Sequence, residues 1–454
     1  MMIAGCAWAH VGSPDIFFQG KAGTHALLVA VRPPDVIPGV ARVEVRALSD
    51  GVEKVEVFPT PISGEAAKHP PVAEVAQRSA SDTHYFEASV WLMSFGSWEV
   101  HVRVNGSNEL LVPVPALALK TRPMSPVIGY FLAGMMVFLT VGMVAIVGAG
   151  VREAEVEPGS ATRPWTARSL AAMGIASIVL TGTLWLGGRW WAEDDAINRR
   201  KVYVPLRAEA TPDKADHLTV HIIDPGWTKL RRLDDLVPDH GHLMHLFLVR
   251  WPAMDEVFHL HPEQMETGYF GLNVPSLPGG NYRIYCDIVH ESGIPETAVG
   301  DVKLPDIEGK PMTGDDSGGS VHFDVNDLGG GYRMAMLKPD HAVPPKQVEL
   351  FTFAITGPDG KPMNDLEPYM GMGGHAEFIK TDGSVFAHLH PTGSVPMASV
   401  AVASPQAMMQ MQEMKIGPTV SFPYGVPTPG RYRIFVQMKR AGKVYTGGFH
   451  LDVK

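Results

Sequence analysis

The sequence predicts a mainly β protein, with three β-sandwich domains of the immunoglobulin-like or cupredoxin-like kind and a two-helix transmembrane hairpin. Short alternating strands broken by Pro and Gly lie on both sides of a long apolar region. After that region, one motif occurs twice, about 130 residues apart. The 454 residues are enough for about three domains. Only 19% of the residues are charged and the formal net charge is -10, which argues against nucleic-acid binding because that needs a basic surface.

Residues 1–9 are interpreted as a residual signal peptide. They end on Ala7-Trp8-Ala9, the A-x-A pattern that precedes a signal-peptidase cleavage site. The segment is short and lacks a basic start, so we expect a truncated leader or a start codon placed too late. Cleavage after Ala9 would expose His10, whose amine and imidazole can chelate copper together. The alternative is that His10 is an ordinary loop residue.

Residues 10–120 are predicted to form an N-terminal β-sandwich. Runs such as Ala41–Ala47 and Tyr85–Leu92 alternate apolar and polar side chains, which is the period of a strand with one buried face. A segment of about one hundred residues has the usual size of such a sandwich.

Residues 127–187 are predicted to form a transmembrane helical hairpin with a short loop at 152–168. The uncharged segment Val127–Val151 is long enough to span a bilayer, and Leu170–Leu186 is shorter but also uncharged. A hairpin returns the chain to the side from which it came. The leader places that side in the periplasm or outside a bacterial inner membrane, whereas the Lys and Arg residues flanking the hairpin favour the opposite orientation. We expect the exported orientation.

Residues 202–308 (the first repeat) and 318–454 (the second repeat) are predicted to be duplicated β-sandwiches. Their closing strands match, Tyr282–Tyr285 in one and Tyr432–Phe435 in the other, and each follows a Pro-Gly turn signal. Asp315–Gly319 is interpreted as a linker. Outside the membrane segments, the only helix expected is a short one in an insertion of the second repeat that contains four methionines: Met408, Met409, Met411 and Met414.

The duplicated motif is rich in soft metal ligands. The first copy holds His240, His242, His245, His259 and His261, and the second holds Met370, Met372, His375, His388 and His390. His245 aligns with His375, and the first two histidines align with the two methionines, so each exchange replaces one soft ligand by another. The two cysteines, Cys6 and Cys286, provide no disulfide framework or CxxC site, so any metal must be held by His, Met or carboxylate.

The spacing predicts one metal site in each repeat. Alternate residues of a strand share a face, so His259 and His261 point the same way, as do His388 and His390. His245 and His375 lie 14 and 13 residues earlier, which suits the opposite arm of a hairpin. Three imidazoles of this kind suit type 2 copper, with zinc as the alternative, and the remaining motif residues (His240, His242, Met370 and Met372) would be extra ligands at the rim. The competing interpretation is that these histidines close strands and bond to backbone or water, and that the methionines of the insertion are packing rather than a Cu(I) site.

The N-terminal domain carries a second candidate ligand set. Asp82 and His84 form an Asp-x-His pair at the start of a predicted strand. With His10 as the mature terminus, this resembles the CopC copper-resistance family, and the resemblance implies that His10, Asp82 and His84 hold Cu(II). It covers residues 10–112 loosely.

The repeats resemble the YtkA-like and FixH-like β-sandwich domains of bacterial membrane and exported proteins. The matching stretches are Met370–His375, His388–Pro391, Gly430–Arg433 and Gly442–Thr446. The resemblance covers most of residues 340–454 and, less closely, 210–305. It implies copper handling or assembly of a membrane complex, with a copper-acceptor protein or complex subunits as partners.

These features together predict a membrane-anchored, exported copper-binding protein that delivers, sequesters or senses copper. No nucleophile elbow, phosphate loop or HExxH motif occurs, so an enzyme is not expected. Two alternatives remain: an accessory or scaffold subunit without a specific metal, and a type 2 copper oxidoreductase, which would need an open coordination position.

Overall fold

The computed structural model describes residues 14–153, 157, 159–161, 164–213, 216–227, 231–323, 326–404 and 416–454. The chain is mainly β, with 45% of residues in strands and 17% in helices, which confirms the predicted fold class. It divides into two compact units. One holds residues up to Ala118 together with Val204–Lys454, and the other is Leu119–Tyr203.

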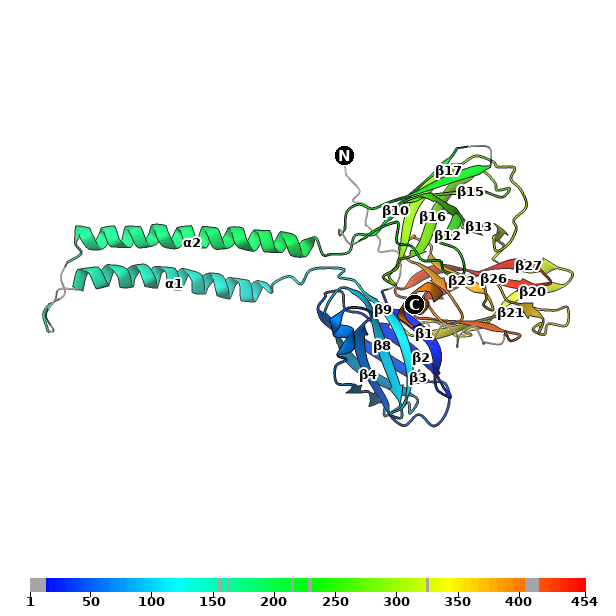
Figure 1. Cartoon of the computed structure of the whole chain (residues 1–454), viewed down its shortest axis with the longest axis horizontal. Helices are drawn as coiled ribbons and strands as arrows, with labels where there is room; N and C mark the ends of the chain where they lie inside the picture. The colour runs from blue at the N-terminus through cyan, green and yellow to red at the C-terminus, as the bar shows by residue number, and fades with distance from the viewer. Residues whose placement is uncertain are drawn as a thin grey trace. The chain divides into compact units, whose positions relative to one another are not determined.

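The second unit contains two long antiparallel helices, α1 (Pro126–Glu153) and α2 (Ala167–Arg199), each long and apolar enough to cross a membrane (Figure 1). α2 therefore continues past residue 187, where the sequence analysis ended the hairpin. The helices contact each other closely at Gly148, where an added Cβ would come within 2.5 Å of the Met173 side chain. Small residues at such contacts let two apolar helices approach.

The N-terminal strands form two antiparallel sheets that enclose an apolar core. Alternate residues of the central strands, such as Val43 and Val45, are fully buried, as the period-2 pattern predicted. The first sheet has the order β1 (Ile16–Ala22), β2 (His25–Arg32), β3 (Gly39–Ala47), β7 (Tyr85–Leu92) and β6 (Gln77–Arg78). The second has the order β5 (Glu74–Val75), β4 (Val55–Pro61), β8 (Gly96–Val104) and β9 (Asn108–Ala116), and a short 3-10 helix spans Glu65–Lys68.

The first repeat folds into a single nine-stranded sheet, because a parallel pairing of Arg207 with Val299 joins its two halves. Its order is β14 (Glu263–Glu266), β15 (Tyr269–Asn273), β11 (His217–Ile223), β10 (Arg207–Pro212), β17 (Pro295–Leu304), β16 (Gly280–Val289), β12 (His245–Arg250), β13 (Glu256–Leu260) and β18 (Ser317–Ser320). The expected linker was therefore wrong in part, since Ser317 to Ser320 form the edge strand β18, which pairs with β13.

The second repeat has two sheets. One has the order β19 (Asp327–Gly329), β20 (Tyr332–Lys338), β21 (Glu349–Thr356) and β25 (Val420–Tyr424). The other has the order β22 (Leu366–Glu367), β26 (Gly430–Arg440), β23 (His375–Lys380) and β24 (Phe386–Leu389), with β27 (Lys443–Val453) on the far side of β26. A seven-residue helix that the sequence analysis missed, α3 (Met397–Ala403), precedes residues 405–415. The expected helix around Met408–Met414 lies outside the described residues.

The two repeats pack against each other through the outer faces of these strands. In β12, Leu246 and Leu248 point into the core of the first repeat, whereas Phe247 and Val249 belong to a separate core shared with the second repeat. That shared core includes a stacked pair, Tyr285 and Phe386, with ring centroids 4.2 Å apart. Both faces of β12 are therefore buried, and so is His245 at its first position.

The N-terminal domain contacts the second repeat immediately after the second motif copy. The backbone of Gln19 donates to the Thr392 carbonyl at 2.6 Å, and Ser394 donates to the Phe17 carbonyl at 2.9 Å. The Phe17 side chain is buried in the core of the second repeat. The chain that follows His390 is thus held on one side by strand β1.

Candidate metal centre

Each motif copy begins with the same tight turn. Asp239 and His242 exchange two backbone hydrogen bonds, and the residues between them, His240 and Gly241, have φ values of 51° and 90°. The corresponding turn of the second repeat has Met370 at φ 49° and Gly371 at φ 77°. Positive φ at both central positions is the signature of a type I′ turn, so the duplication extends to local backbone conformation.

The first triad consists of His245, His259 and His261, whose ligand atoms all lie within 4.8 Å of one another. Strands β12 and β13 pair with Phe247 opposite His259, so the two histidine-bearing ends lie side by side as the hairpin spacing predicted. His245 Nδ1 is 2.9 Å from His259 Nε2. This set is the one expected for the first repeat.

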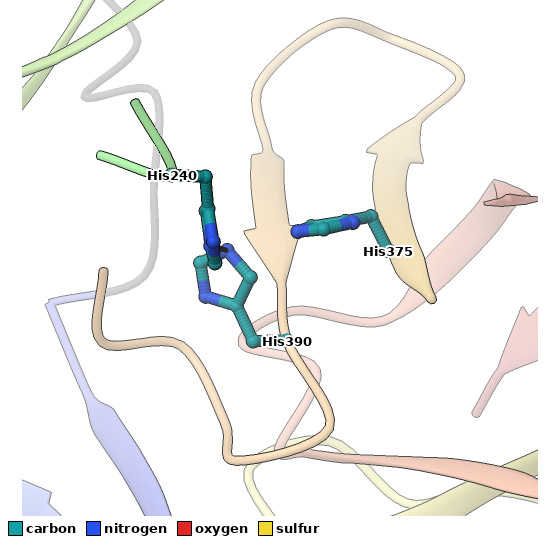
Figure 2. A group of neighbouring side chains, drawn as sticks. All are labelled: His240, His375 and His390. Atoms are coloured by element: carbon teal, nitrogen blue, oxygen red, sulfur yellow. Dashed lines mark hydrogen bonds between the residues drawn. The ribbon is translucent and has the colours of Figure 1, made fainter. Parts of the chain in front are cut away.

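The second triad differs from the expected one. His375 and His390 come together, but the third imidazole is His240 of the first repeat, and these three also lie within 4.8 Å (Figure 2). The His240 and His390 Nε2 atoms are 3.4 Å apart. His388 lies outside this set, because its Nδ1 is held 3.2 Å from Asp287 of the first repeat. The expectation of one self-contained site in each repeat was therefore wrong: the repeats face each other, and each reaches into the other.

The remaining motif residues surround the triads. His242 stacks on His261 with centroids 3.9 Å apart, and its Nε2 lies 3.2 Å from Asp315 at a partly exposed edge. Met370 and Met372 are buried, and the His240 ring hydrogen-bonds to the Met370 backbone. The eight histidines form one contiguous group, called here the histidine cluster: His240, His242, His245, His259, His261, His375, His388 and His390.

Outside acceptors determine which nitrogens of the first triad carry protons. His245 Nε2–H donates to the Asp239 carbonyl at 3.1 Å, and His259 Nδ1–H donates to Gln437 Oε1 at 2.9 Å. The nitrogens that face each other, His245 Nδ1 and His259 Nε2, are then both lone-pair atoms when the rings are neutral. Two acceptors at this distance repel each other unless a proton or a cation lies between them.

The orientation of Gln437 supports this assignment. The Tyr369 hydroxyl donates to the Asp315 carbonyl at 2.7 Å, so it accepts from Ser317, whose hydroxyl is 3.0 Å away. Ser317 must then accept from Gln437 Nε2 at 2.7 Å, which leaves Gln437 Oε1 as the acceptor for His259. In this arrangement, each hydrogen bond of the series from Tyr369 to His259 has one donor and one acceptor.

Carboxylates and carbonyls hold other cluster histidines in the same way. His261 Nδ1 is 2.9 Å from Asp316, and His390 Nδ1 is 3.3 Å from the Val395 carbonyl. Within the described residues, the second nitrogen of His261, that of His388 and both nitrogens of His375 are buried without a hydrogen-bond partner. Metal-binding histidines typically donate their other ring N–H to a carboxylate or carbonyl, which fixes the tautomer.

The cluster is electrostatically suited to cations. Burial, reinforced by neighbouring imidazoles, holds the pKa of His245, His259, His375 and His390 well below the usual value, and burial also lowers the pKa of His240 and His261. These rings are therefore neutral near pH 7, and neutral imidazole is the form that binds metals. Two nitrogens bound 2.0–2.1 Å from one tetrahedral ion lie about 3.3 Å apart, close to the 3.4 Å between His240 and His390. The donor set therefore fits a transition-metal ion.

Sequence reasoning missed the acidic and amide side chains that orient the histidines. Asp315 and Asp316 fell in the segment interpreted as a linker, and Asp287 and Gln437 lie in closing strands whose pattern gave no signal for a site. Asp287 and Gln437 occupy equivalent places, opposite His245 and His375 in the strand register. Each contacts a histidine of the other repeat, and only the packing of the repeats reveals this.

The proposed N-terminal ligands lie elsewhere. Asp82 forms an ion pair with Arg46 at 3.2 Å and accepts from the His84 backbone, while the His84 ring lies 3.8 Å from Asp50. His10 lies outside the described residues. Grouping of His10 with Asp82 and His84 thus stays a prediction.

The sequence matches the family described as a domain of unknown function, DUF8832, at residues 198–303 and 326–454. These segments make up more than half of the chain and cover both triads. The chain belongs to this family. No curated protein matches the sequence.

Three solved structures show some likeness to the DUF8832 chain at low TM-scores. The tetra-tandem repeat in the extending region of a large adhesion protein has 9% identity and a TM-score of 0.18, covering 93% of this chain and 72% of that one. Escherichia coli alpha-2-macroglobulin activated by porcine elastase has 9% identity and a TM-score of 0.19, covering 97% and 31%. Invasin, a bacterial integrin-binding protein, has 8% identity and a TM-score of 0.16, covering 94% and 60%. At these TM-scores, none of the three bears on the function of this chain.

Proposed function

We propose that this protein is a membrane-anchored metal-binding protein that holds copper, with zinc as the alternative ion, in its histidine cluster for delivery, sequestration or sensing. The observation that carries the proposal is the facing pair His245 Nδ1 and His259 Nε2, 2.9 Å apart, whose outer nitrogens are both committed to donate elsewhere. A metal ion supplies the positive charge that two facing lone pairs need.

The all-imidazole donor set supports copper or zinc over harder ions. Mg²⁺ and Ca²⁺ prefer oxygen ligands, whereas imidazole suits Cu and Zn. The partly exposed edge formed by His242 and Asp315 offers the ion a route to solvent and to an acceptor protein. We therefore propose binding and transfer of the ion rather than catalysis.

The anchor and the compartment belong to the same proposal. Residues before and after the two helices form one compact unit, so a hairpin of two membrane-spanning helices leaves both flanks on the same side of the bilayer. We place that side in the periplasm or outside a bacterial inner membrane, as the Ala7-Trp8-Ala9 pattern suggests.

A structural role for the histidines is the competing account. The contacts His259 to Gln437 and His388 to Asp287 both cross between the repeats, and they would support a scaffold whose imidazoles simply hold the repeats together. That account predicts weaker packing, but no loss of metal, when the histidines are replaced.

The test is metal analysis of the full chain in detergent after loading with Cu(II) or Zn(II) and desalting. We expect about two ions per chain, one for each triad. His245→Ala/His261→Ala and His375→Ala/His390→Ala should each reduce this to about one. The matched control, His221→Ala/His341→Ala, removes two histidines outside the cluster and should retain the full amount. No retained metal in the unaltered chain would leave the scaffold account.

A further inference from the structure

We propose that the two triads are halves of one binuclear centre built across the repeats, with His388 as the ligand between them and Glu377 as the carboxylate that balances their charge. This rests on the proposed metal-binding function. Two buried side chains that belong to neither triad, His388 and Glu377, distinguish this centre from a pair of independent sites.

His388 lies between the triads. Its ring centroid is 5.5 Å from His245 and 5.6 Å from His259 on one side, and 5.4 Å from His375 and 4.8 Å from His390 on the other. Asp287 holds its Nδ1 at 3.2 Å, and its Nε2 is buried without a hydrogen-bond partner in the described residues. One nitrogen is therefore oriented from outside while the other is available to an ion, which is the arrangement of a metal ligand.

The triads are close enough for their ions to interact. The ring centroids of His240 and His245, from different triads, are 6.1 Å apart, and those of His259 and His375 are 6.2 Å apart. The aromatic ring of Phe247 packs against the cluster. Its centroid lies 5.0 Å from that of His388, and it stacks on His259 with centroids 4.3 Å apart. The imidazoles of the two triads are thus direct neighbours.

Glu377 is a buried carboxyl group next to the centre. It is fully buried on the same face of β23 as His375, and it is paired in register with His388. Among the described residues, no neighbouring side chain hydrogen-bonds to either of its carboxylate oxygens. Leaving a carboxylate in an apolar core without a partner is costly, and the neighbouring carboxylates Asp287, Asp315 and Asp316 are already paired with cluster histidines. A cation in the adjacent cluster would give Glu377 a partner.

The decisive measurement is electron paramagnetic resonance of the full chain in detergent, loaded with Cu(II), alongside its total copper content. A binuclear centre should hold about two coppers whose spectrum shows dipolar broadening and a half-field transition, because two Cu(II) ions held close together interact through space. Two coppers with the spectrum of isolated ions would overturn the shared centre while leaving metal binding intact. No copper at all would overturn the proposed function itself.

Two variants test the added groups. His388→Ala removes one nitrogen ligand but leaves all six triad histidines, so the affinity for one of the two coppers should fall at least about tenfold while the other copper is retained. Glu377→Gln should weaken binding of the second ion by at least about tenfold, the scale of effect seen for groups that tune a metal site. The matched control, Glu266→Gln, changes an exposed carboxylate and should alter neither value. Because the unaltered chain alone can refute the proposal, a variant that fails to fold does not remove the test. Unchanged affinity for both coppers in a folded His388→Ala chain would exclude His388 as a ligand of the centre.

Discussion

In the first repeat, strand β12 begins at His245 and carries Phe247 two residues later, whereas strand β23 of the second repeat begins at His375 and carries Glu377. The two strands pair with their neighbours in the same register. The turns before them also match in conformation but differ in content, with His240 in one and Met370 in the other. Duplication has preserved the backbone while the side chains that face the other repeat have diverged.

This difference shows how two similar halves can make one asymmetric site. His240 extends from the first repeat to complete the second triad, and Gln437 of the second repeat orients His259 of the first. Neither half holds a complete set of ligands and orienting groups. A change on one side of the pair should therefore be felt on the other.

The largest effect is expected from Phe386→Ala in the core shared by the repeats. Phe386 is buried, stacks on Tyr285 at 4.2 Å and contacts Phe247 at 5.3 Å. Truncating such a side chain costs about 3–5 kcal/mol, and here the loss falls on both repeats at once. Chemical denaturation of the metal-free chain measures it. Trp91→Ala, at an exposed position of the N-terminal domain, should cost much less, and equal losses would mean that the shared core adds little stability.

A smaller effect is expected from exchanging the turn residues. His240→Met places a thioether in the second triad, and thioethers select Cu(I) over divalent ions. The Zn(II) dissociation constant of that site should rise at least about tenfold, measured by competition with a chromogenic chelator. Since Met370 has nearly the same φ as His240, 49° against 51°, the turn can accept a methionine at this position. Unaltered Zn(II) affinity would remove His240 from the site.

The smallest effect is a pH dependence that separates two kinds of buried histidine. In the metal-free chain, four cluster histidines have strongly depressed pKa values (His245, His259, His375 and His390). The unfolded chain therefore binds more protons, and stability falls as the pH drops toward and below the unfolded pKa of about 6.5. Between pH 7.5 and 6.5, the loss is about 1 kcal/mol in total, which lowers the Tm by roughly 2–4 °C.

His290 of the first repeat has the opposite sign. Burial acts to lower its pKa, but hydrogen bonds to Glu296 at 3.0 Å and Asp235 at 2.8 Å outweigh burial and raise it. It therefore contributes stability below its unfolded pKa and loses that contribution as pH rises. Replacing it by Gln should make the thermal stability depend more steeply on pH over the same window. A profile that stays flat in the His290→Gln variant would show that the cluster histidines are not held neutral by burial.

The fold was largely predictable because it rests on local patterns. Alternation in runs such as Ala41–Ala47 gave strands, and uncharged segments gave the two long helices. The helix Met397–Ala403 was missed because MASVAVA shows no amphipathic period. The candidate site was only half predictable. Pairing within a hairpin brings His245 next to His261, but nothing local brings His240 to His390.

One signal for the missing half was present. The run Leu246-Phe247-Leu248-Val249 is apolar at every position, and a strand without alternation is buried on both faces. This pattern predicts a second partner surface for β12, which the shared core supplies. It does not say which residues of that surface carry the ligands, because Asp287 and Gln437 reach the histidines only through packing between repeats.

The contact between His240 and His390 joins residues 150 positions apart, and the segment after His390 is held by the first described strand, β1. A growing chain therefore makes the first triad early but cannot assemble the second until almost all of it has left the ribosome. Long-range contacts of this kind also form slowly. The order of synthesis thus places assembly of the second triad after the helical hairpin has been made, when the histidines of the first triad are already present.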